Sequence, residues 1–225
     1  MEVSDWFDGE PLENIWSLLR DASVLERAGV FLKVVAALEY CHERGVFHRN
    51  ISAESVLVSS DLADVRLGDF NLARDLAATS TLTGGLLVAR DVRLVPPEEL
   101  RGAPAVNARL GDVFQAGVLL YRLLENGAWP FASTLDYATH PAGGLRDFTA
   151  AEEPETAQLR ALIRGMLAVD PATRPDQLKR VESDVRKICA AVGSCRLKAA
   201  SRHRLSEPRQ TAGVRVKRCP RTVNP

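Results

Sequence analysis

The chain has 225 residues, 46% of them hydrophobic, which is enough for one sizeable buried core but too few for two ordinary domains with linkers. Its 29 Lys and Arg balance 29 Asp and Glu, so the bulk charge indicates no specific nucleic-acid partner and no acidic surface. With no apolar stretch of membrane-spanning length, no secretory pattern behind Met1 and four widely spaced cysteines, we expect a cytoplasmic protein with reduced thiols and no membrane contact.

The first predicted element is an amphipathic helix over residues 25–43. Its apolar residues recur on one face at steps of three and four: Leu25, Ala28, Leu32, Val35 and Leu38. Gly45 follows as a natural C-cap residue. The apolar runs at 55–58 and 63–67 then predict two strands of a β-hairpin around the turn at 59–62.

Periodicity stops between residues 69 and 95, which predicts a long loop. Residues 112–125 are then apolar on nearly every side, and this indicates a helix buried all round at the centre of the domain. Helices at 155–168 and 175–192 follow, the second with Pro175 in its first turn. The order predicts a mainly α (α+β) lobe with a short hairpin.

Residues 196–225 differ in composition from the rest of the chain. They carry nine Lys or Arg against the single acid Glu207, with few large apolar residues. Such a segment cannot bury enough apolar surface to offset the entropy of ordering it, so we expect a basic, disordered tail over residues 193–225. An arm that binds polyanions is the alternative, and the lack of interleaved aromatic residues favours a flexible, solvated extension.

Six short motifs occur in an order that is typical of the second half of a protein kinase. They are HRNISAESVL at 48–57, DFN at 69–71, PPE at 96–98, DVFQAGV at 112–118, WPF at 129–131 and DPATRP at 170–175. Together they resemble the C-terminal lobe of a bacterial-type serine/threonine protein kinase, although each motif alone would be weak. Residues 1–9 resemble the hinge that leads into this lobe, which implies a kinase-like C-lobe over residues 10–192.

The resemblance also implies where the chemistry of phosphotransfer lies. In the family an aspartate accepts the proton of the substrate hydroxyl, a lysine neutralises the transferring phosphoryl group, and an asparagine and an aspartate bind Mg²⁺. The corresponding residues here are Asn50, Ser52, Ser55 and Asp69, so only the last position is kept. Because an amide cannot take up a proton at neutral pH, the catalytic loop resembles that of a pseudokinase.

Around these positions the resemblance implies supporting roles. His48 packs beneath the catalytic loop, Arg49 can bind a phosphate on the long loop, and Leu57 forms the floor of an adenine site. Phe70, which follows the metal position, belongs to a surface that an N-terminal lobe covers, and we expect this residue and Leu38 to be exposed without that lobe. The threonine that the family has seven residues before its APE glutamate is Asp91.

Four charged positions have alternative interpretations. Asp69 can be a turn residue after a strand rather than a metal ligand. Glu98 and Arg174 can be solvated charges, whereas the resemblance implies a buried ion pair between them. Asp112 can be an N-cap, which is compatible with the family role of holding the backbone of the catalytic loop.

A kinase carries a glycine-rich phosphate loop and a strand lysine before its hinge, and neither motif occurs here. We therefore expect the N-lobe to be absent, either because the chain is a fragment or because another polypeptide supplies that lobe. No cofactor is expected for the isolated chain, and ATP with Mg²⁺ is expected if an N-lobe is supplied.

Two functions remain open. The first is a binding or regulatory module that acts through a protein partner or through the missing lobe. The second is an enzyme, the catalytic half of a divergent ATP-dependent serine/threonine kinase. The loss of proton-transfer and electrostatic groups favours the first.

Overall fold

The computed structural model describes residues 7–70, 74–75, 91–102, 107–140, 144–149 and 154–191, all within one compact unit over residues 1–195. The sequence predictions for residues 1–6 and 193–225 and for Asn71 fall outside these ranges. The elements in chain order are β1 (Glu10–Pro11), η1 (Leu12–Asn14), α1 (Trp16–Asp21), α2 (Val24–His42), β2 (Val46–Phe47), β3 (Val56–Val58), β4 (Val65–Leu67), β5 (Arg74–Asp75), η3 (Val92–Leu94), α3 (Pro97–Leu100), α4 (Ala108–Leu124), α5 (Thr134–Thr139), α7 (Pro154–Met166), η4 (Pro171–Thr173) and α8 (Leu178–Ala191).

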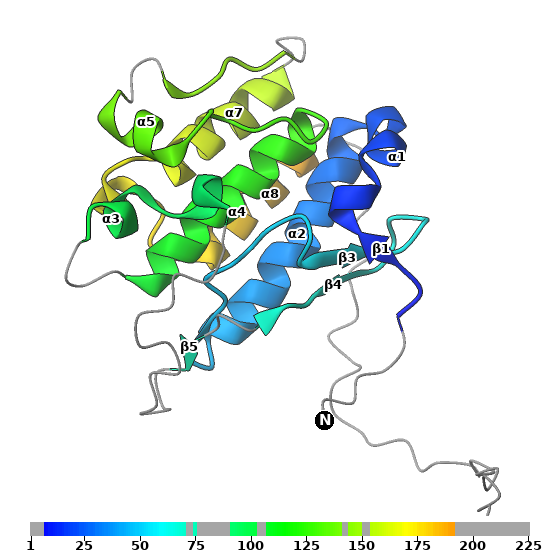
Figure 1. The fold of residues 1–225 in the computed structure, drawn as a ribbon. Coiled ribbons are helices and arrows are strands. Elements are labelled where there is room, and N and C mark those ends of the chain that lie inside the picture. The colour runs from blue at the N-terminus through cyan, green and yellow to red at the C-terminus, as the bar shows by residue number, and fades with distance from the viewer. Residues whose placement is uncertain are drawn as a thin grey trace, which may run out of the picture. The chain divides into compact units, whose positions relative to one another are not determined.

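The described lobe is mostly helical, as predicted, with a small three-stranded antiparallel sheet of order β1-β3-β4. In Figure 1, α4 crosses the centre of the lobe with α2 beside it and the sheet at one edge. Helix α2 packs against both α4 and α8, and α7 packs against α4. Within the described ranges, no helix has both the length and the apolar character needed to cross a membrane.

Helix α2 begins at a capping box. The Ser23 hydroxyl accepts the N–H of Glu26, and the Glu26 carboxylate accepts the N–H of Ser23 in return. The predicted apolar face is buried from Ala28 to Leu38. The expectation that Leu38 is exposed was wrong, because α2 packs against two helices and strand β4 of the same lobe.

The predicted hairpin is present as β3 and β4. Val56 pairs with Leu67 and Val58 with Val65, and β1 adds to the free edge of β3. A second pair, β2 with β5, lies partly in the stretch where the sequence predicts only a loop. Strands of two residues are too short to produce a period that sequence reasoning can detect.

Helix α4 is buried on all sides, as predicted, from Gly111 to Leu124. It begins earlier than predicted, because the Asn107 side chain accepts the first backbone N–H groups and caps the helix. Asp112 therefore lies inside the helix, and its interpretation as an N-cap was wrong.

Helix α8 begins at Leu178, after the predicted start at Pro175. Asp170 caps the 3₁₀ turn η4, and Arg174 then leaves that turn with extended backbone angles, φ −73° and ψ 157°. A residue before proline favours this conformation, and helical hydrogen bonding begins only at Leu178.

The contact between α4 and α7 requires a glycine. A Cβ atom added at Gly117 would lie 2.8 Å from the Cβ of Met166, whereas one added at Gly165 on α7 would meet nothing within 4 Å. We predict that Gly117→Ala lowers the free energy of unfolding by about 1–3 kcal/mol through overpacking. Gly165→Ala is the matched control and should raise it by about 0.5–1 kcal/mol through helix propensity. Urea denaturation measures both changes, and equal effects would contradict the tight contact.

Candidate functional site

The β3–β4 hairpin brings the catalytic-loop motif next to the DFN motif. Residues 48–55 precede β3 and residues 68–70 follow β4, and the Gly68 N–H donates to the Ser55 carbonyl at 2.8 Å. The His48 ring lies between them, with Nε2 2.9 Å from the Gly68 carbonyl and its centroid 4.6 Å from that of Phe70. Nδ1 accepts the Asn50 N–H, so the hydrogen is on Nε2.

Asp112 anchors the catalytic loop from beneath. Its carboxylate is fully buried and accepts the backbone N–H of His48 at 2.9 Å and that of Arg49 at 2.7 Å. Nε2 of His42, on α2, lies 2.7 Å from the same carboxylate. These contacts hold Arg49 in a left-handed conformation (φ 64°), which is strained for a residue with a side chain.

Gln115, one turn further along α4, is a site residue that the sequence analysis missed. Its Oε1 accepts the Ile51 N–H at 2.9 Å, and its Nε2 donates to the carbonyls of Arg49 and Leu94. It joins the catalytic loop to η3 in this way. The available signal was a polar side chain inside an otherwise apolar helix, because such a group needs buried partners.

The four expected reaction positions form two hydrogen-bonded pairs, Asn50 with Asp69 and Ser52 with Ser55. The Asn50 amide nitrogen donates to a carboxylate oxygen of Asp69 at 3.3 Å. The Ser55 hydroxyl accepts the Ser52 N–H and donates to the Ser52 carbonyl, both at 3.0 Å, while the Ser52 hydroxyl accepts the Ser55 N–H at 3.2 Å. Ser55 is only 2% exposed.

This set of donors does not fit a kinase Mg²⁺ site. Mg²⁺ requires oxygen ligands in near-octahedral geometry. Here the hydroxyl of Ser55 is committed to the backbone, and Asn50 turns its hydrogens toward Asp69. Within the described part of the chain, no group of three His, Cys, Asp or Glu side chains is arranged to hold a metal ion.

Leu57, the expected adenine floor, is half-buried between the buried residues Val56 and Val58. Alternation along the strand places its side chain on the opposite face from theirs. An adenine contact at this position stays a prediction.

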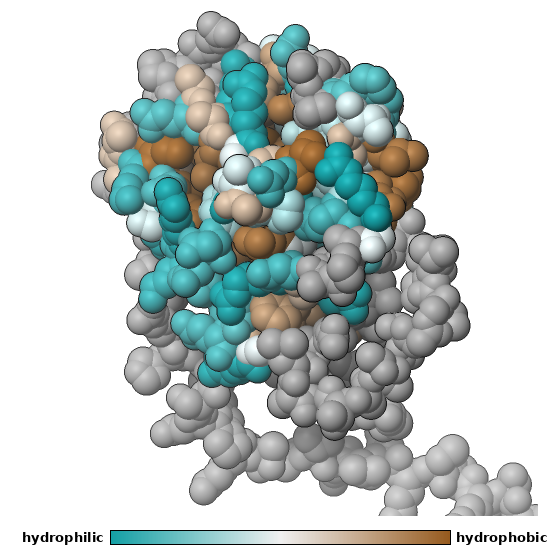
Figure 2. Space-filling view, turned by 90° about the vertical axis from the view of Figure 1, so that its left-hand side faces the viewer, coloured by the Kyte–Doolittle hydropathy of each residue, from teal (hydrophilic) through white to brown (hydrophobic). Residues whose placement is uncertain are grey.

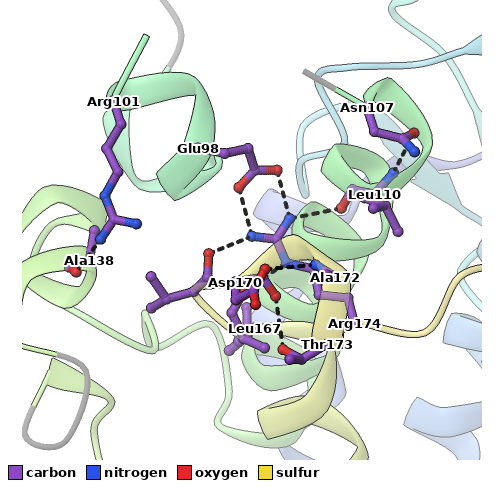
Figure 3. A network of polar contacts seen from close by, with 12 residues as sticks. Glu98, Arg101, Asn107, Leu110, Ala138, Leu167, Asp170, Ala172, Thr173 and Arg174 are labelled. Carbon is purple, nitrogen blue, oxygen red and sulfur yellow. Dashed lines mark hydrogen bonds and ion pairs between the residues drawn. The ribbon is translucent and has the colours of Figure 1, made fainter. Parts of the chain in front are cut away.

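Glu98 and Arg174 form the predicted ion pair. Two parallel bonds of 2.8 and 2.7 Å join the guanidinium to the carboxylate, and both residues are buried. Arg174 also donates to the carbonyl of Leu110 (Figure 3). It donates to the carbonyl of Ala168 as well. Their interpretation as solvated charges was wrong, and the pair ties α3 to the turn before α8.

A stack of charged and aromatic side chains lies at η3, and the sequence analysis did not predict it. Asp91 binds Arg93 through both carboxylate oxygens, and this pairing lowers the pKa of Asp91. The Arg93 guanidinium lies 3.8 Å from the centroid of the Trp129 ring, and that of Arg122 lies 4.1 Å from the same centroid. Arg122 in turn pairs with Glu13, so the stack connects η1, α4 and η3.

Comparison with known proteins gives a consistent result. The family model described as protein kinase domain matches residues 3–185. The probable serine/threonine-protein kinase PknB of Corynebacterium glutamicum is 26% identical over 171 residues, which are 73% of this chain and 26% of the relative. Serine/threonine-protein kinase PEPKR2 of Arabidopsis thaliana is 34% identical over 150 residues, 65% of this chain and 30% of the relative. The chain spans about a quarter to a third of the length of these curated relatives.

The anchor at Asp112 yields a stability prediction. Asp112→Asn replaces a buried acceptor with a group that also donates, which leaves a backbone N–H of the catalytic loop unpaired. We expect the free energy of unfolding to fall by about 3 kcal/mol in urea denaturation. The exposed Asp176→Asn is the control and should stay within about 0.5 kcal/mol of the wild type. A loss equal to that of the control would show that the buried bonds contribute little.

His48 yields a pH prediction. Burial lowers the pKa of His48 from 6.5, and the bond to the Gly68 carbonyl opposes this shift. The unfolded state therefore takes up a proton at higher pH than the folded state, so the contribution of neutral His48 to stability is full above pH 6.5 and is lost as the pH falls. His48→Gln keeps a donor but does not titrate. Thermal melts across pH should show its deficit relative to the wild type shrinking below pH 6.5, whereas a constant deficit would contradict the assignment.

Proposed function

The chain belongs to the protein kinase family, and on this premise we propose that it is a catalytically impaired kinase-like lobe that acts by binding or regulating a protein partner. The observation that carries the proposal is the hydrogen bond that Asn50 donates to Asp69. The amide cannot accept a proton, and its nitrogen lies 3.3 Å from a carboxylate oxygen of Asp69. Loss of a positioned general base typically lowers a rate by a factor of about 100 to 10,000.

The serines of the loop support the same proposal. Ser52 has no charge with which to neutralise a transferring phosphoryl group. Ser52 and Ser55 bind each other through three hydrogen bonds, so their hydroxyls stabilise the loop itself. Three of the four expected contributions to phosphotransfer are therefore weak or lost.

The scaffold around the loop supports a role in binding. The Asp112 anchor and the Glu98–Arg174 pair are both formed, and both belong to the packing of the lobe rather than to the reaction. A lobe that folds in this way presents a defined surface whether or not it transfers phosphate.

The face that carries α3 and α5 is one candidate surface for a partner. Figure 2 shows small hydrophobic patches between hydrophilic residues on this face. Two large apolar side chains are exposed on contacting elements, Val92 of η3 by 46% and Leu135 of α5 by 57%.

A second function has support of its own. Asp69 lies beside the catalytic loop, and the relatives named above are serine/threonine kinases by name. The alternative proposal is the catalytic half of a divergent ATP-dependent serine/threonine kinase, with an N-lobe supplied from elsewhere. Asp69 would then face Mg²⁺, Leu57 would face adenine, and another acid would have to act in place of Asn50.

A reversal experiment tests the proposal. We predict that, in a fusion behind the N-lobe of an active serine/threonine kinase, the triple change Asn50→Asp, Ser52→Lys and Ser55→Asn raises phosphotransfer at least about 100-fold. The three groups act as one unit, so single reversions should recover little. Transfer of labelled phosphate from ATP to a protein acceptor is the measurement.

The matched control is the same fusion with the native residues, checked for folding by circular dichroism. It should stay near background. Appreciable activity of this fusion, abolished by Asp69→Ala, would overturn the proposal and favour the enzyme.

A further inference from the structure

We propose that the side-chain amide of Asn50 takes the place of a divalent cation at Asp69, so that this site is complete without a metal ion. The inference deepens the proposed function, because it concerns the same site.

In the hydrogen bond between Asn50 and Asp69, only Asn50 can be the donor. A carboxylate at neutral pH only accepts hydrogen bonds, so the group of Asn50 that faces Asp69 must be the NH₂ group. The nitrogen lies 3.3 Å from Oδ2 of Asp69. The amide therefore presents partial positive charge where a kinase presents Mg²⁺ to the same carboxylate.

Asn50 reaches Asp69 from a rigid position. Its backbone N–H donates to Nδ1 of His48, and the preceding residue, Arg49, is held in its left-handed conformation by Asp112. The side chain of Asn50 thus starts from a loop that is anchored on the central helix.

Asp69 is also held in place by its neighbours. Its φ of 58° lies in the left-handed region, which Asp enters more readily than most residues. Asn50 provides one hydrogen bond to the carboxylate, and the neighbouring Gly68 is bound by His48 and by Ser55. The contact between the loop and residues 68–70 is therefore formed entirely by protein groups.

The remaining oxygen donor of the expected metal site is already used. Ser55 is buried, and its hydroxyl both accepts from and donates to the Ser52 backbone. Asp69 alone is a weak ligand set for Mg²⁺, which is usually held by more than one oxygen group.

An amide and a carboxylate at position 50 should differ in their need for a metal ion. In the Asn50→Asp variant two carboxylates would lie within contact distance of each other, and like charges at this distance oppose ionisation of both unless the pair holds a proton or a cation. A divalent cation can replace that proton, and it lets both carboxylates ionise. We therefore expect the stability of the Asn50→Asp variant to depend on metal and the stability of the wild type not to depend on it.

The test compares the full 225-residue wild type with Asn50→Asp and with the exchanged pair Asn50→Asp together with Asp69→Asn. Without metal, Asn50→Asp should melt about 2–4 °C below the wild type, the shift that one lost modest interaction causes at this chain length. Mn²⁺ or Mg²⁺ should raise its melting temperature again. The exchanged pair restores an amide opposite a carboxylate, so it should recover stability and show no response to metal.

Mn²⁺ binding, followed by electron paramagnetic resonance, gives a second readout that does not depend on stability. Stoichiometric Mn²⁺ binding is expected for Asn50→Asp alone. Binding by the wild type that is lost in Asp69→Ala would overturn the inference, and so would an Asn50→Asp variant that folds and ignores metal. If Asn50→Asp fails to fold, a folded exchanged pair still supports the inference, and failure of that pair overturns it.

These outcomes are separate from those of the proposed function. Phosphotransfer by the unreverted fusion would refute catalytic impairment, but it would leave the melting and Mn²⁺ results of the isolated chain as they are. Conversely, metal binding by the wild type would refute the present inference without creating a general base at Asn50.

Discussion

The rest of the lobe depends on the hydrogen bonds that the buried carboxylate of Asp112 accepts. It lies inside the central helix and accepts two successive backbone N–H groups of the catalytic loop, with His42 of α2 against it. A charge at this depth is tolerable only while these donors are in place, so α2, α4 and the loop must come together as one unit. The strained backbone at Arg49 and the position of His48 follow from that constraint.

A second pair of buried charges, Glu98 and Arg174, also holds together segments that are distant in the chain. Glu98 and Arg174 lie 76 residues apart in the chain, and their bidentate contact fixes α3 against the turn before α8. Removing one partner would leave the other buried and uncompensated, which is far more costly than the pair is stabilising. Such constraints belong to folding, so they do not depend on which side chains occupy positions 50, 52 and 55.

Sequence patterns predicted the long helices and the hairpin, missed the short helices α1, α3 and α5, and predicted the contacts between elements poorly. The periods of α2 and α4 and the two strand runs come from residues close in sequence, and each element was found. The starts of α4 and α8 were misplaced: α4 begins earlier because Asn107 caps it, and α8 begins later, at Leu178. Gln115 and the Arg122–Trp129 stack have partners that no local pattern specifies.

For the site, motif order located the residues, but their hydrogen bonds could not be predicted because their directions depend on the fold. Motif order predicted that the changes at Asn50, Ser52 and Ser55 fall together at one site, and the structure adds how these side chains are hydrogen-bonded. By the family resemblance, each stands where a kinase has a group that acts on the substrate hydroxyl, the phosphoryl group or the metal, and each is a neutral side chain bonded within the protein. Two carboxylates near each other need a cation or a shared proton, whereas an amide opposite a carboxylate needs neither. Hydrogen bonds within the site therefore support the proposal that the lobe acts by binding a partner.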